Sequence, residues 1–296
     1  MKAILRENAG DLALLIGNGI NLYNNPDQRN SWKGLLGTLA INHIGPDFEK
    51  LPEGLSFTEF FDILEIHAGV GNITSSLQSE FCALMAQWRP QAQHRCISAW
   101  ALAHQVPILT TNFEGTLGQP LNCKIYRLSR TRFVDYYPWD IYYAASPLTD
   151  PLKSFAIWHI NGMQKYRRSV RLSLSHYMGS VERARSWLRR SGSRLFGNND
   201  VASWRGATTW MHVFFHKPLL VFGLRLGSDE VFLRWLLIER ARYFAKHPER
   251  RKKGWYVCPA HDKDWSEGKD MFLRSVGLEP VKVEEWGHMF DDEVWI

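Results

Sequence analysis

The sequence predicts an α/β fold, in which a mostly parallel sheet carries helices on both faces, and three observations support this class. Short apolar runs bounded by turn residues recur along the chain, which is typical of strands buried inside a sheet. Segments of helical periodicity lie between these runs, so that strand and helix alternate. The first run stops at Gly17-Asn18-Gly19, and two glycines at this spacing after a strand are typical of Rossmann-like nucleotide-binding folds.

Seven apolar runs are expected to form the strands, and they lie at residues 12–16, 107–111, 124–128, 155–159, 219–223, 255–258 and 281–283. Helical patterns lie between them, at residues 57–67, 75–88, 94–104 and 231–244. The helical stretch around 57–104 and a basic stretch around 165–216 both interrupt the strand series. We therefore expect a single domain over residues 1–296, with these two segments as helical insertions that form a cap.

The composition is that of a globular protein. The chain has 296 residues, of which 45% are hydrophobic and 22% charged, enough to bury a large core. No run approaches the roughly 18 apolar residues needed to cross a bilayer, so we expect a cytoplasmic protein without a membrane segment. Its four cysteines form no C-x-x-C pair, which argues against a zinc site and against a disulfide framework. We expect free thiols and no bound metal.

The positive charge is concentrated in one part of the chain. Between Lys165 and Arg205 there are ten Lys or Arg residues and two acidic ones, a local charge of +8 against +6 for the whole chain. Such a segment can meet a phosphate-rich ligand, a nucleic acid or an acidic protein surface. Because it contains few interleaved aromatic residues and no recognised nucleic-acid motif, a solvated helical face or a contact with a partner protein is favoured over sequence-specific DNA binding.

Polar segments follow four of the expected strands, at residues 17–21, 110–114, 158–162 and 223–229. In open parallel sheets, ligands bind beyond the carboxyl ends of the strands, where the strand order reverses, so we expect these segments to line one pocket. Each segment also has a simpler interpretation. The two glycines can form a plain strand-to-helix turn, Asn112 can bond its own backbone, and His159 can be an ordinary core histidine.

The order of these segments resembles the sirtuin family, and more closely its bacterial NAD-hydrolysing branch, which is found in antiviral defence. Gly-Asn-Gly-Ile-Asn at 17–21 is similar to the phosphate-binding glycine loop of that family. Thr-Thr-Asn-Phe-Glu at 110–114 is similar to its Thr-x-Asn-x-Asp loop, with Glu114 in place of the aspartate. Trp-His-Ile-Asn-Gly at 158–162 resembles the strand end that carries the catalytic histidine, and Val-Phe-Gly-Leu at 221–224 resembles the later glycine strand.

The resemblance implies roles for individual residues. It implies that Asn112 and His159 are catalytic: Asn112 holds the nicotinamide ribose or the attacking water, and His159 acts as a general base. The residues that it implies for NAD binding are Gly17, Asn18, Gly19, Asn21, Thr111, Glu114, Gly223 and Ser228.

The activity that the resemblance implies is hydrolysis of NAD to nicotinamide and ADP-ribose, by a gated effector of antiphage defence whose activity a partner protein or oligomerisation controls. Two alternatives remain open. One is an NAD-dependent protein deacylase, against which the missing zinc-binding cysteine pairs argue. The other is a non-catalytic, nucleotide-sensing subunit of a complex. NAD is thus the expected ligand, as a substrate, and neither a metal nor a membrane is an expected partner.

Overall fold

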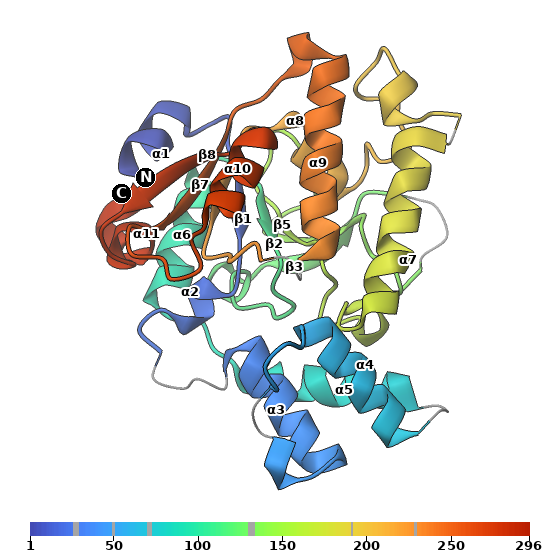
Figure 1. The fold of residues 1–296 in the computed structure, drawn as a ribbon. Coiled ribbons are helices and arrows are strands. Elements are labelled where there is room, and N and C mark those ends of the chain that lie inside the picture. The colour runs from blue at the N-terminus through green and yellow to red at the C-terminus, as the bar shows by residue number, and fades with distance from the viewer. Residues whose placement is uncertain (26–29, 49–50, 70–72, 130–133, 191, 228–229) are drawn as a thin grey trace.

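A computed structural model describes residues 1–296 except 26–29, 49–50, 70–72, 130–133, 191 and 228–229 (Figure 1). Its centre is one sheet of eight strands in the order β3-β4-β5-β2-β1-β6-β7-β8. The strands are β1 Ala13–Ile16, β2 Ile108–Thr110, β3 Lys124–Arg127, β4 Ile141–Ala144, β5 Ile157–His159, β6 Leu219–Phe222, β7 Gly254–Pro259 and β8 Glu279–Val283. Only β4 pairs antiparallel with its neighbours, so the predicted α/β fold with a mostly parallel sheet is confirmed.

The strand order reverses at β1. From β1 the chain adds β2 and then β5 on one side, and later β6, β7 and β8 on the other. Leaving β3 and β4 aside, the six parallel strands have the order 3-2-1-4-5-6 of the Rossmann fold. The carboxyl end of β1, where the glycine loop begins, therefore lies at the point where a dinucleotide binds in folds of this order.

The seven expected strands are present, and β4 is an eighth that the sequence analysis missed. It is short, and Pro138 and Pro147 lie close to its ends, which made the segment look like a loop. It pairs along its whole length with β3 but through one residue pair, Tyr143 with Ile157, with β5. The two strands extend the sheet on the β5 side.

The helices of the described residues are α1 Lys2–Asn8, α2 Gly19–Leu22, α3 Trp32–His43, α4 Phe57–Ala68, α5 Ile73–Leu84, α6 Ala92–Ala103, α7 Leu174–Arg185, α8 Trp210–His216, α9 Val231–Lys246, α10 Glu267–Ser275 and α11 Gly287–Phe290. Several begin at a serine that caps the first turn. Ser56 and Glu59 form a reciprocal capping box at the start of α4, and the Ser173 hydroxyl accepts a hydrogen bond from the His176 amide in α7. No helix among the described residues is long and apolar enough to cross a bilayer.

Alternate residues of each central strand point to opposite faces of the sheet, and each face has its own core. Leu14 and Ile16 of β1 pack with α1, α6 and α11, whereas Ala13 and Leu15 pack with α7, α8, α9 and α10. Figure 1 shows α7 and α9 on one side of the sheet and α1, α6 and α11 on the other. The strands are therefore buried on both faces, as the continuous apolar runs indicate.

A third core lies apart from these two. It is formed by α3, α4 and α5, with residues such as Leu36, Phe61 and Phe81, and it includes Phe113 from the loop after β2. Figure 1 shows these three helices as a separate layer beyond α2. Phe113 thus joins the helical layer to the carboxyl edge of the sheet.

The two expected insertions differ from the observed layers in their extent. The separate helical layer begins with α3, at Trp32, whereas α6, expected within the insertion around 57–104, packs on the sheet. In the segment around 165–216, α7 and α8 also pack on a face of the sheet, and every residue of α8 is buried. The difference arises because amphipathic periodicity shows that a helix has a buried face, but does not show which layer that face contacts.

Candidate functional site

The glycine loop after β1 packs directly against the backbone of the loop after β6. The Gly17 amide donates to the Phe222 carbonyl (3.1 Å), and the Gly19 amide donates to the Gly223 carbonyl (2.7 Å). A Cβ atom at Gly17 would lie 2.5 Å from the Gly223 oxygen, and one at Gly19 would lie 2.8 Å from the Gly223 Cα. Gly223 itself has a φ of +64°, in the left-handed region. All three glycines are thus required by the packing of two main chains at the point where the strand order reverses.

The loop after β2 holds Asn112 beside this glycine loop. The Thr110 hydroxyl donates to the Ile16 carbonyl (3.0 Å) and accepts from the Asn112 amide (3.1 Å), which ties the start of the loop to β1. The Asn112 side chain reaches the same strand end, where its Nδ2 donates to the Gly17 carbonyl (3.4 Å). Asn112 is 4% exposed. The carboxyl ends of β1 and β2 therefore share a buried amide.

His159, the last residue of β5, completes the group. Its Nδ1 lies 2.6 Å from the Asn112 carbonyl oxygen. Because a carbonyl oxygen can only accept, Nδ1 must carry the hydrogen, and the lone pair of the neutral ring is then on Nε2. Nε2 is buried and has no hydrogen-bond partner among the described residues. Burial lowers the pKa of His159 to about 4, so the ring is neutral at pH 7.

Asn21 is the centre of a second buried network beneath the glycine loop. Its Nδ2 donates to Asn18 Oδ1 (2.8 Å) and to Glu114 Oε1 (3.0 Å), and its Oδ1 lies 3.0 Å from His94 Nε2. The Thr116 hydroxyl donates to the same Glu114 oxygen (3.0 Å). Burial raises the pKa of Glu114, and the hydrogen bonds from Asn21 and Thr116 oppose that rise. The network fixes the glycine loop to the loop after β2 and to α6.

The structure brings the described residues of the predicted site to one edge of the sheet. The Thr111 amide donates to the Ile16 carbonyl (3.1 Å), which adds this residue to the same edge. Ser228 lies outside the described residues. The residues at the edge are Gly17, Asn18, Gly19, Asn21, Thr111, Asn112, Glu114, His159 and Gly223.

Sequence reasoning missed three polar residues that belong with this group. His94 and Thr116 hold Asn21 and Glu114, and the Asn161 side-chain oxygen, just after β5, is buried without a hydrogen-bond partner among the described residues. No local signal marks His94, which is 73 residues from Asn21 in the chain. Asn161 had a signal, because it follows His159 by two positions in a segment already singled out.

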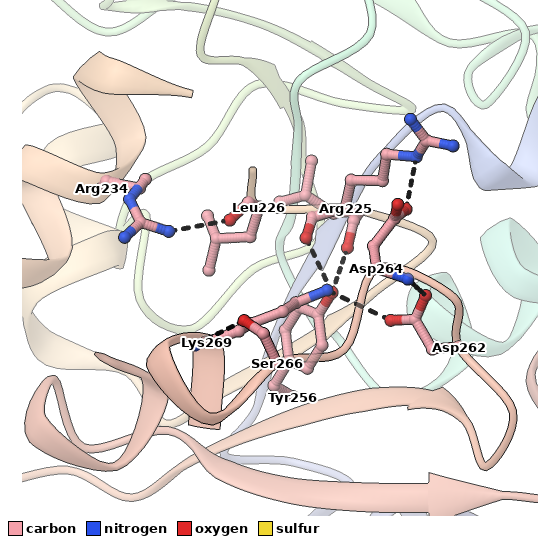
Figure 2. Close-up of polar contacts among 9 residues, drawn as sticks. Arg225, Leu226, Arg234, Tyr256, Asp262, Asp264, Ser266 and Lys269 are labelled. Carbon is pink, nitrogen blue, oxygen red and sulfur yellow. Dashed lines mark hydrogen bonds and ion pairs between the residues drawn. The ribbon is translucent and has the colours of Figure 1, made fainter. Parts of the chain in front are cut away.

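On the other side of the strand reversal, residues 224–226 after β6 form a wall that polar contacts tie to β7 (Figure 2). The Tyr256 hydroxyl of β7 donates to the carbonyls of Leu224 (2.6 Å) and Arg225 (3.1 Å). Lys269 at the start of α10 lies 3.1 Å from the Asp262 carboxylate and 5.2 Å from the centre of the Tyr256 ring. Burial raises the pKa of Tyr256, so its hydroxyl stays protonated and donates. The backbone that follows Gly223 is thereby fixed.

The predicted catalytic residues, and the residues beside them that are predicted to bind NAD, are nearly closed to solvent in this structure. His159 is 3% exposed, and Thr111 and Glu114 are 6% and 4% exposed. Two cavities, of about 290 and 650 Å³, are lined by other residues, the first beside β3 and β4 and the second between α7 and α9. Among the described residues, no three His, Cys, Asp or Glu side chains gather in a way that could hold a metal ion.

Comparison with protein-family models finds no match, and comparison with curated proteins finds no match either. The functional interpretation therefore rests on the residues of this chain and on their geometry.

Proposed function

We propose that this protein hydrolyses NAD to nicotinamide and ADP-ribose, acting in the cytoplasm as a gated effector of antiphage defence. One observation carries the proposal: the neutral His159 has a buried Nε2 lone pair with no partner among the described residues, at the carboxyl edge of a sheet with Rossmann strand order. A buried acceptor without a partner costs free energy, about 1–3 kcal/mol. A ligand hydroxyl that donates to Nε2 would remove that cost.

The position of His159 supports a substrate with two halves. Dinucleotides lie across the strand reversal, and here the reversal at β1 separates the side of β2 and β5 from the side of β6 and β7. We assign the nicotinamide ribose to the β2 and β5 side, where Asn112 and His159 lie. The adenosine half then belongs near Gly223 and the wall held by Tyr256. The amides of Gly17 and Gly19 donate within the protein, so these two donors do not bind the pyrophosphate.

Hydrolysis of NAD requires a general base and a ribose that is held in position, but no general acid. The nicotinamide ring of NAD is positively charged and leaves the ribose as a neutral molecule, taking the electron pair of the bond that breaks, so no proton has to reach the leaving group. His159 Nε2 accepts a proton from a ribose hydroxyl or from the attacking water, a contribution of roughly 100- to 10,000-fold. Its Nδ1–H bond to the Asn112 carbonyl holds the ring in the tautomer that leaves Nε2 free. The Asn112 amide orients the ribose or the water.

The closed site supports the idea of a gate. Asn112 and His159 are each less than 5% exposed, so a molecule as large as NAD reaches them only after the surrounding loops move. Phe113, adjacent to Asn112, packs against Trp32 and Phe81 of the helical layer, which couples that layer to the catalytic loop. A partner protein or self-association that shifts α3–α5 would therefore open the site.

A non-catalytic nucleotide-sensing subunit is the second candidate, because the Rossmann strand order is that of a dinucleotide-binding fold whether or not the bound nucleotide reacts. On this alternative the protein binds NAD or ADP-ribose but releases no nicotinamide.

The test is to incubate the purified protein with NAD, alone and with the product of the neighbouring gene, and to follow nicotinamide and ADP-ribose by chromatography. Hydrolysis predicts that both products form in equal amounts and that an acetyl-lysine peptide does not change the rate. A requirement for the peptide would identify a deacylase. Binding of ADP-ribose without release of nicotinamide would identify the sensing subunit.

A further inference from the structure

A groove between α7 and α9 lies on the face of the sheet that is remote from α1 and α6, and its volume is about 650 Å³. One wall is a single stripe of α9 in which Trp235, Glu239, Arg242 and Lys246 follow one another at helical spacing. The stripe covers twelve residues of helix, and its first and last residues lie about 16 Å apart along the axis. Arg242 and Lys246 are exposed, and Trp235 is half-buried.

The opposite wall is formed by α7 and the π-helical turn Ser186–Arg190 that continues it. Arg185 and Arg189 are one turn apart on this wall, and both are exposed. The Arg189 guanidinium lies 4.1 Å from the centre of the Phe196 ring, which holds it against the floor of the groove. Arg185 and Arg189 on this wall therefore line the same groove as Arg242 and Lys246 of α9.

The single carboxylate among the residues that line the groove is already paired. Glu239 is 2% exposed, and its two oxygens lie 2.6 Å from Arg189 Nε and 2.7 Å from Arg242 Nη1. It thus links the two walls and holds both guanidinium groups in place. Four cations against one carboxylate leave the lining with a net charge of +3.

We propose that this α7–α9 groove binds single-stranded nucleic acid through its phosphates. Three of the four cations are arginines, whose planar guanidinium groups match phosphate oxygens in pairs. The half-buried Trp235 offers an aromatic face for a base, and a basic groove with an aromatic platform is typical of sequence-independent single-strand binding. An acidic peptide would use the charges but would gain less from the aromatic ring.

The test measures the fluorescence anisotropy of a short fluorescein-labelled oligodeoxythymidine as the intact protein is added, at a series of salt concentrations. We expect binding that weakens steeply as salt rises. In the variant Arg185→Ala/Arg242→Ala, two phosphate contacts are lost. The affinity should fall about tenfold, and the magnitude of the salt slope should fall by about 1.4.

The matched control is Lys124→Ala/Lys153→Ala, which removes the same charge from two exposed positions that do not line the groove, one at the start of β3 and one between β4 and β5. Its affinity should equal that of the wild type, and thermal melts should show both variants folded. Should the double variant fail to fold, Arg185→Glu alone, at an exposed position of α7, replaces it.

Three results would overturn the proposal: no binding at low salt, an equal loss of affinity in the control variant, or displacement of the oligonucleotide by poly-glutamate at equal charge. The last result would assign the groove to an acidic protein segment. None of these measurements depends on NAD hydrolysis, so they test nucleic-acid binding by the groove independently of the proposed activity.

Discussion

The end of β5 and the helix α8 both contain buried histidines, but these histidines differ in their hydrogen-bond partners. Burial lowers the pKa of His159 and of His212 to about 4, and that of His216 to about 3. By this measure alone the three side chains are alike, because each is kept neutral at pH 7.

Their hydrogen-bond partners separate them. In α8, His212 Nδ1 accepts from Trp204 Nε1 (3.1 Å), and His216 Nδ1 donates to the His212 carbonyl (2.9 Å) while its Nε2 lies 3.5 Å from the Tyr243 hydroxyl. Both rings pack among aromatic side chains of the core. In the part of the chain that the structure describes, His159 Nδ1 has a partner and its Nε2 is buried with none. A lowered pKa is thus a consequence of burial, whereas a free lone pair at a strand end is the feature that points to chemistry.

The largest expected effect is on the rate of NAD hydrolysis, which should depend on His159 but not on His212. Replacement of His159 or Asn112 by Ala should lower the rate of NAD hydrolysis by at least about 100-fold, since in the proposed mechanism each side chain contacts the reacting ribose or water. His212→Ala should leave the rate per folded molecule unchanged and lower stability by about 1–3 kcal/mol, because Trp204 loses its acceptor. Nicotinamide release, normalised to the folded fraction from thermal melts, is the measurement. Equal rates for His159→Ala and the wild type would end the catalytic assignment.

The second expectation concerns pH, where all the buried histidines act alike. Their folded pKa values lie below the unfolded value of about 6.5, so the unfolded chain takes up protons between pH 6.5 and 4 that the folded chain does not. The free energy of unfolding should therefore decrease as the pH is lowered through this window, by about 2 kcal/mol per histidine from pH 7 to pH 5. Melting temperatures at the two pH values test this, and His212→Ala should reduce the difference. A melting temperature that does not change with pH would contradict it.

The third expectation concerns stability at the carboxyl edge of the sheet. We expect Gly19 to be required for packing, as the buried residues of α8 are. Gly19→Ala should destabilise the protein by about 1–3 kcal/mol, since its Cβ would lie 2.8 Å from the Gly223 Cα. Gly10→Ala is the control, because a Cβ there meets nothing within 4 Å. Urea unfolding gives both free energies. If Gly19→Ala is as stable as the control but no longer binds ADP-ribose, the loop serves the ligand rather than the fold.

The smallest expected effect belongs to Glu114, in the buried network that includes His94. Glu114→Gln keeps an oxygen that accepts from Asn21 and Thr116, so it should change stability by less than about 1 kcal/mol. Glu114→Ala removes the acceptor and should cost more. Urea unfolding of the two variants tests this order. A large loss in the Gln variant would mean that the charge, and not the acceptor, holds the network.

The features of the fold and of the candidate site that the sequence predicted are those with a local signal. The strands before Gly17, Asn112 and His159 were predicted because an apolar run that stops at a polar or glycine residue is visible within a few positions. Once the fold class is known, parallel strands bring their carboxyl ends to one edge, so the gathering of these residues follows as well.

The rest depends on contacts between distant parts of the chain. Asn21 and Glu114 are 93 residues apart, and nothing near either residue indicates that they share a hydrogen bond. The same holds for the close contact of Gly17 and Gly19 with the main chain at Gly223, which is about 200 residues away in the chain. The sequence also did not show that α6 packs on the sheet, because an apolar stripe indicates a buried face but not the element that it contacts.

The most direct test is nuclear magnetic resonance of protein carrying ¹⁵N-labelled histidine, titrated with ADP-ribose at pH 7. The account predicts that His159 Nε2 is unprotonated in the free protein, and that its resonance shifts on binding as a ribose hydroxyl donates to it. The resonances of His212 and His216 should not move. A protonated Nε2, or a His159 resonance that is unchanged at saturating ADP-ribose, would contradict the assignment of this histidine to the nicotinamide ribose.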